Sequence, residues 1–106
     1  GNVVTLDLSS AQTFALTVDQ EVLSFKLTNP PSGSTAFTLK ILQDSTGYSV
    51  DIDTFNDNGG SAIPVYWPAA VTPGVTTTAS KTDIYSFMTF DGGSSLYGVV
   101  GGQNFA

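Results

Sequence analysis

The side chains best suited to chemistry in this sequence are the acidic and amide groups of residues 51–60. Asp51 and Asp53 stand two positions apart, so on an extended strand both carboxylates would point to the same side. Asn56, Asp57 and Asn58 follow close behind, and two glycines come after them. Because Ca²⁺ takes oxygen ligands, Asp51, Asp53 and Asp57 are candidate calcium ligands.

The same segment also has a simpler interpretation. An EF-hand loop needs a third ligand two residues on, a glycine at its sixth position and a bidentate Glu at its twelfth, and this spacing does not supply them. Asn, Asp and Gly are the usual residues of a solvated turn. We therefore expect no cofactor, with calcium as the alternative, and take Asn56, Asp57 and Asn58 as candidate binding residues on an exposed loop.

This chain has few of the side chains that enzymes use for catalysis. There is no His, no Cys and no Arg, which removes the usual general base, the thiolate nucleophile and the planar anion clamp. Asp51 and Asp53 could form a carboxylate pair, but no second feature supports one. We expect a protein that is not an enzyme, and single acids such as Asp83 and Asp91 are expected to keep the surface soluble.

Aromatic residues offer a different kind of site. Tyr66 and Trp67 lie between two prolines, and an exposed pair of this kind can hold the apolar face of a sugar ring. Tyr66 and Trp67 are therefore candidate binding residues. The competing interpretation is that the only Trp of a small chain fills its core or a subunit contact, and that Tyr48 and Tyr97 are packing groups.

Size and charge limit the possible partners. With 106 residues and 41% hydrophobic composition, residues 1–106 suffice for one domain with one core. The net charge is −6 and three Lys are the only cations, so nucleic acid and anionic membranes are poor partners. No apolar run approaches the roughly 20 residues of a membrane helix, and we expect no membrane insertion.

Alternating apolar and polar residues set the expected secondary structure. Strands are predicted wherever this alternation lies between turn residues, at residues 3–8, 14–18, 23–28, 37–42, 48–55, 75–78, 83–90 and 95–100. Residues 63–68 would form an edge strand or an ordered loop. We expect hairpins between 14–18 and 23–27 and across Asp91-Gly92-Gly93-Ser94, and we place Asp51, Asp53 and Phe55 on one face of their strand. The expected fold is all-β: an antiparallel β-sandwich of seven to eight short strands, jelly-roll-like.

The order of several motifs resembles a known family. The segments FALTV, VLSFKLTNPPSGSTAFTLKILQD, VYWPAAV and DIYSFMTFDGGSSLYG, followed by a glycine-rich end, resemble a β-rich module of virion structural proteins of tailed bacteriophages, found near the C-termini of tail fibres and related surface proteins. Two features depart from that pattern: residues 51–61 are inserted, and Leu96 stands where many relatives have Trp.

The resemblance implies a structural protein of the virion that has no catalytic residues. Its task would be that of a tail-fibre or receptor-binding surface domain, with other virion proteins and a host surface glycan or protein as partners. Such modules are commonly homotrimers, so Tyr85, Phe87, Met88 and Phe90 would face a neighbouring subunit in part. Capsid decoration and carbohydrate binding are the alternative functions.

Overall fold

Strands are the main regular secondary structure of this protein. The computed structural model describes residues 2–105, which form nine strands and a 3-10 turn, η1 (Pro68–Ala70). The strands are β1 (Val3–Asp7), β2 (Thr13–Val18), β3 (Ser24–Thr28), β4 (Thr35–Gln43), β5 (Phe55–Asn56), β6 (Ala62–Ile63), β7 (Val65–Tyr66), β8 (Thr82–Thr89) and β9 (Leu96–Phe105). The prediction of an all-β domain is confirmed. Within the described residues, no helix is long and apolar enough to cross a membrane.

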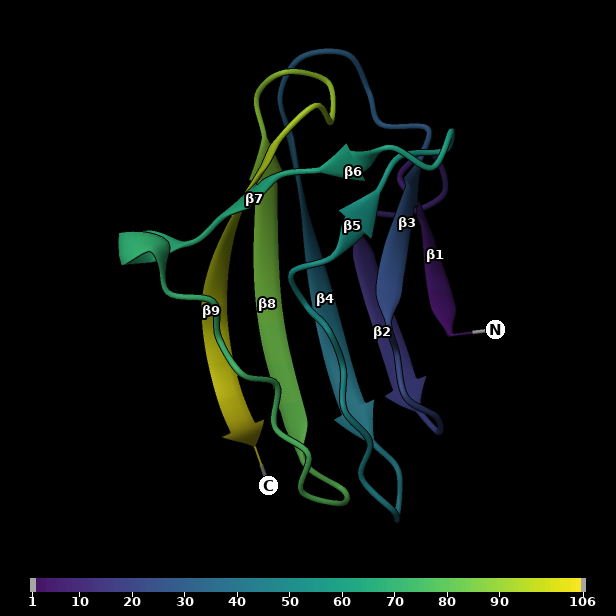
Figure 1. The fold of residues 1–106 in the computed structure, drawn as a ribbon, viewed down its shortest axis with the longest axis vertical. Coiled ribbons are helices and arrows are strands. Elements are labelled where there is room, and N and C mark those ends of the chain that lie inside the picture. The colour runs from purple at the N-terminus through teal and green to yellow at the C-terminus, as the bar shows by residue number, and fades with distance from the viewer. Residues whose placement is uncertain (1, 106) are drawn as a thin grey trace.

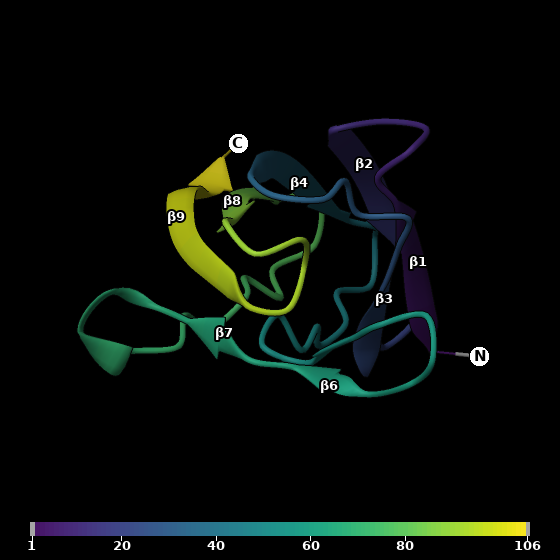
Figure 2. The ribbon, with the colours of Figure 1, turned by 90° about the horizontal axis from the view of Figure 1, so that it is seen from above.

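The strands form two curled sheets, which Figures 1 and 2 show from two sides. One sheet has the order β1-β3-β5-β6, and the other has the order β2-β4-β8-β9-β7. The first four strands alternate between the sheets, so β1 comes to lie beside β3 and β2 beside β4. Because each of these pairs is joined through the other sheet, both pairs run parallel.

The expected antiparallel arrangement is therefore wrong for part of the fold. The pairs β1–β3, β2–β4, β3–β5 and β7–β9 are parallel, and only β4–β8, β5–β6 and β8–β9 are antiparallel. The expected hairpin between residues 14–18 and 23–27 is also wrong, because β2 and β3 belong to different sheets. Both strands have an apolar face. That face can be buried equally well whether the two strands pair within one sheet or face each other from two sheets.

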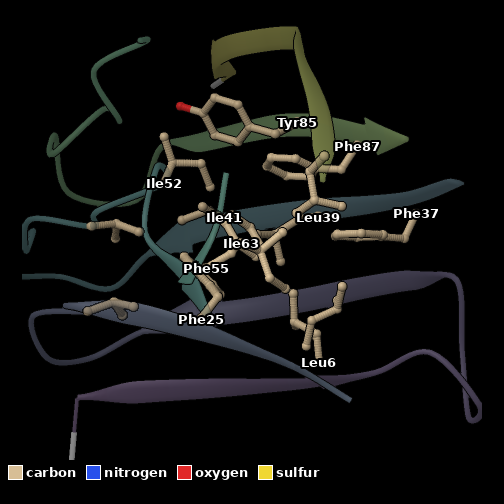
Figure 3. Packing of buried hydrophobic residues seen from close by; sticks show 14 of the residues in the cluster. Leu6, Phe25, Phe37, Leu39, Ile41, Ile52, Phe55, Ile63, Tyr85 and Phe87 are labelled. Carbon is tan, nitrogen blue, oxygen red and sulfur yellow. The ribbon is translucent and has the colours of Figure 1, made fainter. Parts of the chain in front are cut away.

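A cluster of phenylalanines joins the two sheets (Figure 3). Phe25 and Phe55 of the first sheet are stacked 5.1 Å apart, as are Phe37 and Phe87 of the second sheet. The Phe55 and Phe87 ring centroids are 5.0 Å apart, which brings the sheets into contact. The expectation that Phe55 shares a face with Asp51 and Asp53 is therefore wrong, since Phe55 is buried and both acids are exposed. A turn at residues 52–53 interrupts the strand and changes which face the next residue occupies.

Two expected strands are replaced by irregular chain. Within residues 48–55 only the start of β5 and a single bridge from Val22 to Val50 remain, and residues 75–78 form no strand. The buried amide of Gln43 holds these segments instead: its Nε2 donates to the carbonyls of Tyr48 (2.7 Å) and Thr76 (2.9 Å), and its Oε1 accepts from the Tyr48 N–H (2.8 Å). One side chain thus satisfies backbone groups that a sheet would otherwise pair.

The last hairpin follows the sequence prediction. β8 and β9 are antiparallel neighbours joined by residues 90–95, where Gly92 and Gly93 both have positive φ. Along β8 the side chains of Tyr85 and Phe87 point into the core and are fully buried. The expectation that these two rings face a neighbouring subunit is therefore wrong, since the protein's own core already covers them.

Candidate binding surfaces

Three loops gather at one end of the molecule, the upper end in Figure 1. They are residues 29–34 between β3 and β4, residues 57–61 between β5 and β6, and the turn between β8 and β9. The Gly92 N–H donates to the Gly33 carbonyl (2.9 Å), and a Cβ at Gly93 would lie 3.0 Å from the Pro30 ring. Direct contact therefore holds the first and third loops together.

The gathered loops enclose a pocket of about 470 Å³, which we call the loop-end pocket. Its lining combines apolar side chains with short polar ones and glycines: Leu27, Pro30, Asp57, Asn58, Gly59, Ala62, Ile63, Gly92, Gly93 and Ser94. Asp57 shapes the second loop, since its Oδ1 accepts from the N–H groups of Gly59 and Ser61, both at 2.9 Å. Asn58 is exposed, so its amide can bond a ligand.

A second concavity lies on the other side of the same loop. It measures about 560 Å³ and is lined by Val3, Thr5, Ser24 and Lys26 together with residues 56–60. The loop that contains Asn56, Asp57 and Asn58 therefore lies between the loop-end pocket and this second concavity. Asp57 and Asn58 line both of them, whereas Asn56 lines only the second.

The three candidate calcium ligands are engaged in separate hydrogen bonds. Asp51 accepts from the Asp53 N–H (2.9 Å) and the Thr54 hydroxyl (2.8 Å), and Asp53 Oδ1 accepts from the Trp67 indole N–H (2.7 Å). Asp57 binds its own loop. Among residues 2–105 no group of three or more His, Cys, Asp or Glu side chains is placed to hold a metal ion.

Calcium binding can be tested directly. We expect the melting temperature to stay unchanged when millimolar calcium is added, because each of these carboxylates already has protein donors. Differential scanning calorimetry with calcium, and with magnesium as the control, measures this. A rise that depends on calcium concentration would contradict the expectation, since a cation that binds only the folded state must stabilise it.

Trp67 belongs to the core rather than to an exposed platform. Only 7% of its surface is exposed, and its ring packs edge-on against Phe87 at 5.6 Å. The ring also lies directly on Gly98, where a Cβ would be 2.5–2.8 Å from three of its atoms. Of the two interpretations drawn from the sequence, burial of the single Trp is confirmed.

Tyr66, in contrast, is 52% exposed and belongs to a row of three aromatic rings on the outer face of the larger sheet. Its ring lies 5.5 Å from that of Tyr97, and Tyr97 in turn lies 5.8 Å from Phe90. We call Tyr66, Tyr97 and Phe90 the aromatic row. Sequence reasoning missed Tyr97 as a surface residue, because only the register of β7 with β9 places it beside Tyr66.

The acid that the sequence placed on the surface, Asp83, is buried. Its Oδ2 accepts from the Thr76 N–H (2.8 Å) and the Tyr85 hydroxyl (2.7 Å), and its Oδ1 accepts from the Asn104 N–H (2.8 Å). Burial raises the pKa of the Asp83 carboxyl, but these donors lower it further, and the net shift is downward. Burial also raises the pKa of Tyr85. Asp83 is therefore a fixed anion that accepts a hydrogen bond from the Tyr85 hydroxyl. Its bonds to Thr76 and Asn104 hold the chain before β8 and the end of β9 together.

This arrangement predicts acid sensitivity. Because the folded-state pKa of Asp83 lies below the unfolded value of about 3.9, its contribution to stability is complete above that value and is lost as pH falls through the folded pKa. We expect Asp83→Asn to cost about 2–3 kcal/mol at pH 7, since an amide offers one acceptor oxygen in place of two, and to weaken the pH dependence below about pH 4. Urea unfolding from acid to neutral pH measures both effects, with the exposed Asp19→Asn as the control; equal losses from the two variants would contradict the prediction.

Comparisons with protein-family models, with curated proteins and with solved structures found no match to this chain.

Proposed function

We propose that this chain is a non-enzymatic structural module of a bacteriophage virion, which acts as a tail-fibre or receptor-binding surface domain that contacts the host cell envelope. The order of sequence motifs supports the virion origin, and the two sheets around one phenylalanine core support a β-sandwich scaffold. Variable loops on such a scaffold can bind without disturbing the core.

The observation that carries the proposal is the loop-end pocket. Loops from three separate parts of the chain reach one end, and the Gly92–Gly33 hydrogen bond fixes two of them before any ligand arrives. A pocket that is already formed loses little conformational entropy on binding. The exposed amide and hydroxyl groups of Asn58 and Ser94 lie at its lining and can donate and accept hydrogen bonds.

Immunogold electron microscopy of the phage that encodes the chain tests this location. Antibodies against the purified protein should label the tail fibres or their tips. Label over the shell would instead support capsid decoration, in which the same module would stabilise the assembled capsid by binding it. Particles without any label would contradict the virion assignment itself.

The homotrimer that the resemblance implies is part of the proposal. Of the four side chains expected at a subunit contact, Tyr85 and Phe87 are buried in the core. Met88 and Phe90 lie beside Tyr97 of the aromatic row, so the proposed trimer would meet at another surface. Sedimentation velocity at micromolar concentration should detect a species of three times the chain mass, and a monomer at that concentration would contradict it.

A further inference from the structure

The aromatic row provides a surface for which neither the core nor the loop-end pocket accounts. Tyr66, Tyr97 and Phe90 are 52%, 45% and 61% exposed, although they are large apolar groups in a protein with a well-filled core. Their rings form an unbroken series with centroids 5.5 and 5.8 Å apart. Exposed apolar groups that gather in one place indicate a binding surface, whereas isolated ones need no explanation.

The row stands on rigid backbone. Tyr66 of β7 and Tyr97 of β9 are register partners, and Tyr97 is also the register partner of Met88 in β8. The Tyr97 ring is in contact with two neighbouring rings, those of Tyr66 and Phe90. Little side-chain freedom therefore remains to be lost when a ligand settles on it.

Beside the two tyrosines lies a hollow of about 250 Å³. Its lining is Tyr66, Trp67, Pro68, Tyr97, Gly98 and Val99, none of which is charged. Two tyrosine rings inclined at 35° make the apolar part of this surface, and the phenol hydroxyls can donate and accept hydrogen bonds. The combination suits a ligand with one apolar face and a rim of hydroxyls.

The size of the surface argues against a second copy of the chain. A stable protein interface takes about 800 Å² and 20–30 residues from each side. Across the outer face of the sheet, the apolar surface gives way to small and polar residues: Met88 is paired with Ala36, and the next positions on that face are Thr38 and Ser86, whose hydroxyls lie 3.3 Å apart. The aromatic row itself consists of three exposed rings, a set far smaller than the 20–30 residues of such an interface.

Charge decides which small ligand fits. The chain has a net charge of −6 and only three Lys, and no cation lines the hollow within the described residues. An anionic sugar would therefore find no partner there and would be repelled by the protein as a whole. We infer that Tyr66 and Tyr97, with Phe90 behind them, form a stacking site for a neutral hexopyranose unit of an oligosaccharide. This stacking site lies outside the loop-end pocket, and the inference does not depend on what that pocket binds.

Binding of neutral tetrasaccharides built from glucose, galactose or mannose tests the inference. Isothermal titration calorimetry should find at least one that binds with a Kd of about 1 mM or tighter, and 3′-sialyllactose should bind more weakly. Tyr97→Ala and Tyr66→Ala should each weaken binding at least about tenfold, while Tyr97→Phe should stay within about threefold because it keeps the ring. Phe105→Ala is the matched control, since Phe105 is 47% exposed but makes no ring contact with the row.

Three results would overturn the inference. The first is that none of the neutral tetrasaccharides binds with a Kd of about 1 mM or tighter. The second is that both alanine variants, each checked for folding by near-ultraviolet circular dichroism, bind as the parent does. The third is a self-associated species in sedimentation that Tyr97→Ala dissociates, because a second copy would then occupy the row. Labelling of virions tests the proposed function separately, so each hypothesis can fail while the other stands.

Discussion

Phe87→Ala should lower the free energy of unfolding by about 3–5 kcal/mol. The Phe87 ring is fully buried and is the point at which the two sheets meet: it stacks on Phe37 at 5.1 Å and also contacts Phe55 and Trp67 at 5.0 and 5.6 Å. Its removal would leave a cavity between side chains that belong to different sheets. The surrounding strands cannot close that cavity without breaking their ladders, so little of the loss would be recovered.

Phe90→Ala is the matched control for this prediction. Phe90 is the same residue type only three positions along the chain, but it is 61% exposed and touches the Tyr97 ring alone among aromatic groups in the described part of the chain. Its loss should cost less than about 1 kcal/mol. Chemical denaturation of the two variants measures the difference, and similar losses would mean that the core is not centred on Phe87.

Gly47→Ala should be nearly as damaging, by about 3 kcal/mol or more. Gly47 has a φ of +85°, which L side chains rarely adopt, and a Cβ there would collide with the main-chain carbonyl oxygen of Thr77. That contact is the place where the turn after β4 meets the irregular segment before β8. Because the obstacle is backbone, a side-chain rotation cannot relieve it, and the two segments would have to separate.

Gly60→Ala distinguishes the two causes of this effect. Gly60 has a similar φ of +89°, but nothing lies within 4 Å of the position that a Cβ would take. Its replacement should therefore cost only the backbone term, about 1–2 kcal/mol. Thermal unfolding of both variants gives the comparison. A Gly47 variant no less stable than the Gly60 variant would show that the approach of Thr77 does not matter.

Local pattern was enough to predict which side of most strands is buried. Phe37, Leu39 and Ile41 face inward as their spacing requires, and the Asp-Gly-Gly-Ser turn joins β8 to β9. These features depend on a period of two and on residues that tolerate positive φ, and both are properties of a short stretch of chain.

Features that depend on distant partners could not be predicted in the same way. Alternation shows that β2 and β3 each have a buried face, but it does not show that they belong to opposite sheets. The burial of Asp83 depends on donors from Thr76 and Asn104, which lie far from one another in the sequence. The aromatic row depends likewise on a parallel register between β7 and β9.

Competition for phage adsorption tests the central claim most directly, namely that the loop end binds the host surface. Bacteria would be incubated with an excess of the purified chain before the phage that we propose as its source is added. Asn58→Trp would fill the loop-end pocket from an exposed position, and Ser45→Trp would place the same ring in the turn after β4, at the opposite end of the molecule (Figure 1). We predict that the parent chain and Ser45→Trp slow adsorption and that Asn58→Trp does not. Undiminished adsorption with the parent chain, or equal inhibition by the two Trp variants, would contradict the claim.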